Sequence, residues 1–134
     1  YIPIHGKLDT VIDTGEVVQV YDYKSKQAMS INEIKGETKN SNGDYFRQLV
    51  FYKILVLANS KWKLKKSTES LVFIRPDKKE SCPIVTLEVS KADIDKVNTE
   101  IDSLAKAVWS GEILKSTCGK DGCEYCSVRA LLKH

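Results

Sequence analysis

The sequence predicts a single α/β domain in which helices flank a mixed central sheet. Apolar segments follow one another in the order strand, strand, helix, strand, strand, helix, which is typical of this class. The 134 residues are enough for one hydrophobic core, and 42% hydrophobic with 29% charged residues is an ordinary globular composition. No apolar run is long enough to cross a bilayer, so we expect no contact with a membrane.

The first part of the chain predicts a β-hairpin followed by a loop. Residues 2–12 are rich in Ile, Val and Leu, and residues 17–24 alternate apolar and polar side chains, so both are expected to be strands. Residues 13–16 contain a glycine and are expected to form the turn between them. The polar stretch 25–43 is expected to be a mobile loop.

The middle of the chain predicts a helix and two further strands. Asp44 is a good N-cap for a helix over residues 44–59, whose apolar residues are spread widely enough to pack on a sheet. Residues 61–70 are expected to form a basic loop. Residues 71–75 and 83–89 are apolar and are expected to be short strands.

A long amphipathic helix is expected after these strands. Ser90 and Asp93 form a capping-box pattern at its start, apolar residues recur at helical spacing, and Gly111 is expected to end it. Residues 116–134 form a cysteine-containing C-terminal tail of the same domain. Within the tail, residues 125–133 predict a short last helix.

Asp22 and Lys24 are the first candidates for a functional site. They lie two residues apart on a predicted strand, so both side chains point to the same face. Val18 and Val20 share that face and indicate that it is partly buried, where charged groups are rarely found without a role. Asp9 lies near the end of the first predicted strand, and the hairpin register can place it beside Asp22. The alternative is an ordinary ion pair on an exposed strand face.

The chemistry of these residues suits a divalent metal site. The carboxylates of Asp9 and Asp22 and the main-chain carbonyl of Tyr23 offer the hard oxygen ligands that Mg²⁺ and Mn²⁺ prefer. Such an ion lowers the pKa of bound water and neutralises charge on a phosphate. Lys24 is suited to hold the attacking water and to stabilise negative charge in the transition state.

Three segments resemble the motifs of the RecB-like branch of the PD-(D/E)XK nuclease superfamily. They are Gly-Lys-Leu-Asp at residues 6–9, Val-Tyr-Asp-Tyr-Lys-Ser at residues 20–25 and Gln-Leu-Val-Phe-Tyr at residues 48–52. Members of that branch carry a Gly-x-Ile/Leu-Asp strand, an Asp-Tyr-Lys-Thr strand and a helix with Gln-Leu-x-x-Tyr in this order. The resemblance therefore covers the first part of the chain directly and the rest through compatible element order.

The resemblance implies a restriction-endonuclease-like fold and a set of roles. Asp9 and Asp22 correspond to the metal-binding acids, and Lys24 corresponds to the catalytic lysine. Gln48 and Tyr52 correspond to the helix residues near the site, and their spacing of four points both the same way. From composition alone, these two would be an ordinary helix residue and a core aromatic.

The chain departs from the family pattern at its start. Members usually carry an acid or a histidine on a helix before the first strand, and this chain begins at Tyr1, after that point. We therefore expect a fragment of a longer protein whose isolated activity is incomplete. Many members also have Arg after the first acid, where this chain has Thr10.

The function that the resemblance implies is that of a Mg²⁺- or Mn²⁺-dependent deoxyribonuclease in DNA repair or recombination. RecB-like modules often lie at the C-terminus of superfamily 1 helicases. The expected partners are therefore DNA and helicase domains of the same polypeptide or complex. The formal net charge of +3 is too small for binding nucleic acid by charge alone. The alternative is a catalytically inactive DNA-binding or scaffolding module, against which the presence of both acids and the lysine argues.

Three of the four cysteines crowd the C-terminal tail: Cys118, Cys123 and Cys126. Such bunching suits a metal site better than a disulfide framework, and we expect a reducing, cytoplasmic setting. The tail resembles that of RecB-like nucleases holding a 4Fe–4S cluster with three C-terminal cysteines and one upstream, although their last cysteine would fall near Leu132. Zinc with His134 as a fourth ligand is a second option, and reduced or air-oxidised thiols are a third. Cys82 precedes a proline at a strand start and is expected to be structural.

Overall fold

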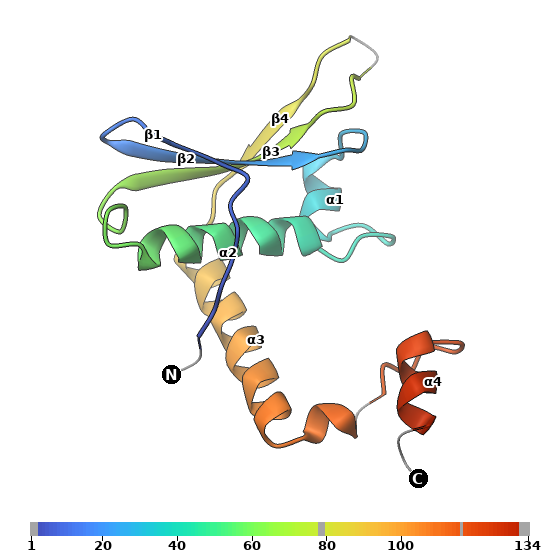
Figure 1. Ribbon diagram of the computed structural model, residues 1–134. Coiled ribbons are helices and arrows are strands. Elements are labelled where there is room, and N and C mark those ends of the chain that lie inside the picture. The colour runs from blue at the N-terminus through green and yellow to red at the C-terminus, as the bar shows by residue number, and fades with distance from the viewer. Residues whose placement is uncertain (1–2, 78–79, 116, 132–134) are drawn as a thin grey trace. The chain divides into compact units, whose positions relative to one another are not determined.

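The computed structural model describes three ranges of the chain: residues 3–77, 80–115 and 117–131. The chain forms two compact units, of which one runs from Pro3 to Val97 and the other begins at Asn98. The boundary falls inside a long helix, α3 (Lys91–Trp109), which Figure 1 shows in orange. Each unit is therefore described by itself.

The first unit contains a four-stranded sheet. Its strands follow the order β1 (Thr10–Asp13), β2 (Val17–Lys24), β3 (Lys66–Phe73) and β4 (Ile84–Leu87). The outer pairs are antiparallel, whereas β2 and β3 are parallel. Parallel neighbours require a crossover connection, and the chain between them forms helices α1 (Ile31–Lys35) and α2 (Asp44–Ala58). The mixed α/β sheet with flanking helices that the sequence predicted is confirmed.

Helix α2 covers one face of this sheet, as Figure 1 shows. The side chains of β2 alternate between this face and the opposite one, so Val18 and Val20 are fully buried while Tyr23 is exposed. The core joins residues from the sheet, α1 and α2 that are at most 7% exposed: Val18, Val20, Ile34, Leu49, Tyr52, Val56, Leu71, Phe73 and Leu87. Burial of these side chains fixes α2 against the sheet and holds the site described below in place.

The first strand is much shorter than the prediction of residues 2–12. Residues 3–9 are not in a strand, and residue 2 lies outside the described residues. Pro3 has no amide hydrogen to give to a ladder. At the other end of the segment, the N–H of Tyr23 binds the side chain of Asp9 instead of a backbone carbonyl. The ladder between β1 and β2 therefore begins only at Thr10.

Helix α1 lies within the stretch 25–43 that the sequence predicted as a loop, so that prediction is wrong for five residues. Ser30 and Glu33 form a complete capping box at its start, and Gly36 ends it in the left-handed conformation. Ile34 is fully buried in the core. The helix is stabilised by this one buried contact and by well-formed caps.

Two boundaries near α2 also differ from the prediction. The N-cap of α2 is Gly43, and Asp44 is the first helical residue, where its charge still favours the helix N-terminus. The predicted basic loop 61–70 is wrong in its second half, because β3 begins at Lys66. The predicted strand 71–75 therefore starts five residues too late, and the other predicted elements of the first unit are present with ends that differ by at most two residues.

The long helix α3 starts as the sequence predicted. Ser90 and Asp93 form reciprocal side-chain to backbone hydrogen bonds at its first turn. After it come the short 3₁₀ helix η1 (Glu112–Leu114) and α4 (Glu124–Leu131). Residues 132 and 133 of the predicted last helix lie outside the described residues. Among the helices that the structure describes, none combines the length and hydropathy of a membrane span.

Candidate active site

Asp22 is a buried carboxylate at the C-terminal end of β2. It is 3% exposed and lies on the face of the sheet that α2 covers, two residues after Val20. Strand alternation accounts for this position, because Val18, Val20 and Asp22 share one face. A carboxylate in such a place is costly unless polar partners meet it.

Two residues of α2 supply those partners. The hydroxyl of Tyr52 donates a 2.6 Å hydrogen bond to Asp22 Oδ1, and Nε2 of Gln48 donates another of 3.1 Å to the same atom. Nε2 of Gln48 also donates to the Tyr52 hydroxyl at 2.7 Å. Gln48 and Tyr52 are one helical turn apart, so both reach the same point. The structure thus brings together the three residues that the sequence placed in the second and third motifs.

Lys24 completes the cluster from the next position on the same strand face. Its Nζ lies 2.5 Å from Asp22 Oδ2 and donates a 2.6 Å hydrogen bond to Oε1 of Gln48. It also lies 4.7 Å from the centre of the Tyr45 ring, a cation–π contact. The Lys24 side chain is only 14% exposed. Its position is therefore defined by an acid, an amide and an aromatic ring.

The contact with Tyr45 was not predicted from the sequence. Tyr45 lies three residues before Gln48 in the first turn of α2, so it points to the same side of the helix. An aromatic residue one turn before the Gln-x-x-x-Tyr pair was the available signal. A second lysine, Lys26, lies 4.5 Å from the same ring.

Asp9 approaches the cluster from the segment before β1. The prediction that Asp9 lies on the strand is wrong, but its expected neighbourhood is found. Its Oδ2 accepts a 3.1 Å hydrogen bond from the N–H of Tyr23, the residue between Asp22 and Lys24. The β1–β2 pairing of Thr10 with Tyr21, continued by one residue, places Asp9 opposite Asp22.

The hydroxyl of Tyr52 reports the electrostatics of this region. Burial raises the pKa of Tyr52 far above its ordinary value, and the hydrogen bond and charge of Asp22 and the charge of Asp9 raise it further. Both carboxylates therefore act on one hydroxyl. Tyr52 stays protonated and remains a hydrogen-bond donor to Asp22.

One oxygen of this site is incompletely satisfied. Oδ2 of Asp22 is buried and accepts no hydrogen bond of regular geometry from the described residues, although the Lys24 ammonium pairs with its charge. A buried carboxylate oxygen in this state is a suitable ligand for a hard cation. Asp9 supplies a second carboxylate beside it.

The carbonyl of Tyr23 points toward the same edge. The carbonyl of Lys24 accepts a hydrogen bond from Ile74, on the β3 side of the strand. Backbone groups alternate along a strand, so the N–H and carbonyl of Tyr23 face the other side, where Asp9 lies. The two acids and this carbonyl form an all-oxygen donor set that fits Mg²⁺ or Mn²⁺.

The comparison with protein families agrees with this geometry. Residues 2–131 match the model of the PD-(D/E)XK nuclease superfamily. The chain belongs to this superfamily. No curated protein and no solved structure shows significant similarity to it.

Membership explains why the site is arranged as it is. The name PD-(D/E)XK describes an acid followed by an acid-x-lysine element, and Asp9 with Asp22-Tyr23-Lys24 provides both. The superfamily consists of nucleases, which generally use divalent metal ions. The membership of this chain in the superfamily therefore indicates a phosphodiesterase that acts on nucleic acid.

The cysteines of this superfamily member lie in two places. Cys118, Cys123 and Cys126 converge in the second unit, with all three Sγ atoms within 4.8 Å of one another. All four cysteines are free, and Cys82 is exposed near the start of β4. His134, the fourth zinc ligand considered from the sequence, lies outside the described residues.

Proposed function

We propose that this chain is a Mg²⁺- or Mn²⁺-dependent nuclease domain that hydrolyses phosphodiester bonds in DNA. The observation that carries the proposal is the buried Asp22, whose Oδ1 is held by Tyr52 and Gln48 while Oδ2 has no regular hydrogen bond. A carboxylate held at Oδ1, with an Oδ2 that only the Lys24 ammonium meets among the described residues, is suited to share that oxygen with a metal cation. Superfamily membership supports the same conclusion independently.

In this proposal the metal ligands are Asp9, Asp22 and the main-chain carbonyl of Tyr23. When bound, a divalent cation would acidify a water molecule and neutralise charge on the phosphate. Tyr52 and Gln48 hold Oδ1 of Asp22, so Oδ2 is the oxygen that would bind the ion. The strand fixes the Tyr23 carbonyl relative to Asp22, because the two belong to adjacent residues.

Lys24 has a separate role in the reaction. Its ammonium lies beside Asp22 and is steered by Gln48 and the Tyr45 ring. There it can hold the attacking water and stabilise the negative charge that grows on the phosphate oxygens. The water oxygen forms the new bond to phosphorus, and the bond from phosphorus to the leaving sugar oxygen breaks.

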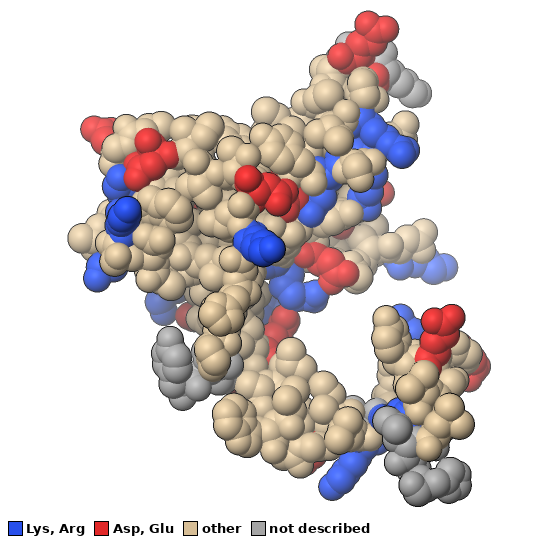
Figure 2. All heavy atoms as spheres, in the orientation of Figure 1, with Lys and Arg blue, Asp and Glu red and all other residues tan. Residues whose placement is uncertain are grey.

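The mixed surface charge indicates that general electrostatic attraction alone does not hold a DNA substrate on this protein. Figure 2 shows basic and acidic side chains interspersed over the face in view, consistent with the formal net charge of +3. A protein with this charge distribution depends on local contacts for DNA binding. Lys24 and Lys26 at the end of β2 are the nearest such contacts to the site.

The proposal is tested by DNA cleavage in Mg²⁺ or Mn²⁺ with the intact parent protein that the sequence leads us to expect, and EDTA provides the metal-free control. Cleavage should require the cation and should be lost in Asp22→Asn, which keeps the shape of the side chain. Equal cleavage by the Asn variant would overturn the site. Cleavage that persists in EDTA would overturn the metal requirement.

The second candidate is a DNA-binding or scaffolding module that has kept the fold without activity. It differs from the nuclease in a measurable way, because it binds DNA and leaves it intact under every metal condition. Intact Asp9, Asp22 and Lys24 in one cluster favour the nuclease. Mn²⁺ binding without any DNA cleavage by the intact parent protein would favour the inactive module.

We further propose that the domain works beside a DNA helicase in repair or recombination. This extension is supported only by the resemblance of the three motifs to RecB-like modules. The coding sequence on either side of the chain tests it. A Gly-x-x-x-x-Gly-Lys-Ser/Thr phosphate-binding motif in the same polypeptide or in a co-purifying subunit would support it, and its absence from both would contradict it.

A further inference from the structure

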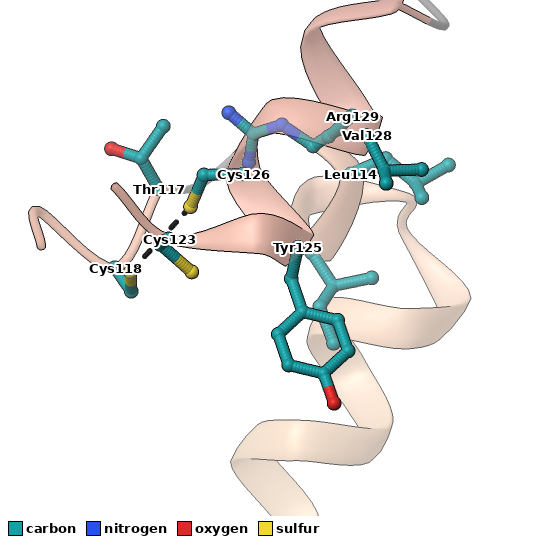
Figure 3. A pocket seen from close by; sticks show the side chains of 9 residues that line it. Leu114, Thr117, Cys118, Cys123, Tyr125, Cys126, Val128 and Arg129 are labelled. Carbon is teal, nitrogen blue, oxygen red and sulfur yellow. Dashed lines mark hydrogen bonds between the residues drawn. The ribbon is translucent and has the colours of Figure 1, made fainter. Parts of the chain in front are cut away.

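The second unit contains three thiols that the proposed nuclease site does not use. Sγ of Cys118 lies 3.5 Å from Sγ of Cys126, and Sγ of Cys123 lies within 4.8 Å of both. Figure 3 shows the three side chains gathered beside the start of α4. None of them is in a disulfide. Two adjacent cysteines are commonly explained by a disulfide bond, but a disulfide cannot account for three free thiols that lie together.

The local backbone is built to bring these thiols together. Gly119 and Gly122 both have φ of 68°, a left-handed conformation that other residues rarely adopt. They turn the chain between Cys118 and Cys123 so that the two side chains meet. Cys126 lies in the first turn of α4, three residues after Cys123, and so faces the same side.

Backbone N–H groups face the sulfur atoms. The N–H groups of Cys126 and Tyr125 face Sγ of Cys123. The N–H of Lys120 faces Cys118 in the same way. Thiolates so close together repel one another, and N–H groups directed at ligand sulfurs are a common outer shell of metal sites.

We propose that Cys118, Cys123 and Cys126 bind one soft divalent cation in tetrahedral geometry, for which Zn²⁺ is the best chemical match. A Zn–S bond of about 2.3 Å places thiolate sulfurs about 3.8 Å apart in a tetrahedron. The separations of 3.5 Å and at most 4.8 Å bracket that value. The fourth position is open to water or to another side chain.

The distances between the three sulfur atoms also distinguish a site for a single ion from a site for an iron–sulfur cluster. In a 4Fe–4S cluster each cysteine binds a different iron atom, so the thiolate sulfurs lie farther apart than around one ion. The chain also has Leu132 where the resemblance would require another cysteine. The three thiols therefore fit one cation better than a cluster.

The surroundings of the thiols suit a bound cation. The thiols line an open hollow of about 510 Å³ that gives an ion access from solvent. Arg129 lines it as well, three residues after Cys126 on the same helix. Three thiolates with one divalent ion carry a net charge of −1, which a neighbouring guanidinium compensates.

The test is metal analysis of the full chain purified under reducing conditions, followed by titration with Co²⁺ as a spectroscopic probe for Zn²⁺. We expect about one zinc per chain. Bound Co²⁺ should show the strong visible bands of tetrahedral coordination and sulfur-to-cobalt charge transfer in the near ultraviolet. The Co²⁺ spectrum of the unmodified protein reports the ligands without requiring any variant to fold.

Serine variants identify the ligands. Competition with a zinc chelator should show at least about tenfold weaker binding in Cys118→Ser, Cys123→Ser and Cys126→Ser, since even outer-shell changes cost that much. Cys82→Ser is the matched control and should bind as the unmodified chain does. Equal loss in Cys82→Ser, iron with acid-labile sulfide, or a metal-free protein with a Cys118–Cys126 or Cys123–Cys126 disulfide would each overturn the proposal.

Discussion

Tyr52 on α2 donates a 2.6 Å hydrogen bond to Oδ1 of Asp22 on β2, thirty residues earlier in the chain. The contact connects the helix that covers the sheet with the strand that carries the site. It also leaves Oδ2 of Asp22 as the oxygen available to a cation. The packing of α2 on the sheet and the chemistry of the site therefore depend on the same pair.

Removing the Tyr52 hydroxyl tests whether metal binding and cleavage depend on the orientation of the Asp22 carboxylate. Tyr52→Phe keeps the ring in the core and removes one donor to a buried carboxylate. We expect a fall of about tenfold or more in cleavage rate or metal affinity, and a loss of about 2 kcal/mol in the free energy of unfolding. Tyr21→Phe, a matched change on the opposite face of β2, should alter neither. Normal metal affinity and rate in Tyr52→Phe would show that the hydroxyl does not position the acid.

Gln48 connects the acid to the lysine, because Nε2 donates to Asp22 and Oε1 accepts from Lys24. Gln48→Ala removes both contacts and should lower the cleavage rate by about tenfold. Gln48→Asn keeps an amide on a shorter side chain. It should recover little of the cleavage rate, because the shorter amide cannot reach both Asp22 and Lys24. Kinetics of the Ala and Asn variants beside Gln19→Ala, on the other face of β2, provide the check. Full activity in Gln48→Ala would remove it from the site.

Lys24 separates catalysis from metal binding. Lys24→Ala should reduce cleavage by about 100-fold or more, because it removes a charge beside the reacting phosphate. It should leave Mn²⁺ affinity equal or higher, because the ammonium no longer competes for Asp22 Oδ2. Lys63→Ala, an exposed lysine in the loop after α2 and outside this cluster, is the control for lost positive charge. A loss of Mn²⁺ binding together with cleavage would contradict the assigned role of Lys24.

The sequence predicted side-chain directions well where the periodicity of a strand or helix determines them. Alternation along β2 places Asp22 and Lys24 on one face, and the spacing of four places Gln48 and Tyr52 on one side of α2. Only the tertiary contact between α2 and β2 shows that the two pairs meet. The contact of Lys24 with Tyr45 depends on the same packing.

The parts of the fold that the sequence missed have physical reasons. Capping interactions stabilise α1, and the Ser30-x-x-Glu33 signature was present within a polar stretch that otherwise reads as a loop. The polar start of β3 contains Glu69, which is 2% exposed. Its carboxylate is met by Lys53 from α2 at 3.7 Å and by the hydroxyl of Ser67. A local sequence pattern cannot predict a buried charge when the residue that pairs with it lies on another helix or strand.

Glu69 gives the fold a testable pH dependence. Burial raises the pKa of Glu69, although Ser67 and Lys53 oppose the shift. A folded-state pKa above the unfolded value means that the contribution to stability is complete below the unfolded pKa and is lost as pH rises through the folded pKa. Denaturant unfolding should therefore show Glu69→Gln gaining stability relative to the unmodified chain as the pH rises above about 4, the ordinary pKa of a glutamate.

The matched control for this measurement is Glu88→Gln, which removes one exposed carboxyl and so accounts for the change in net charge. The relative stability of the Glu69 variant should change with pH after this correction. A difference that is constant with pH, or that changes in the opposite direction, would show that burial does not dominate at Glu69.

The central claim is that Asp22 and Asp9 hold a divalent cation, and Mn²⁺ binding measured by calorimetry tests it most directly. The unmodified chain should bind Mn²⁺, and both Asp22→Asn and Asp9→Asn should weaken binding by at least about tenfold. Asp13→Asn, a carboxylate on β1 that pairs with Lys65 away from this cluster, should bind as the unmodified chain does. Unchanged Mn²⁺ affinity in both site variants would contradict the account.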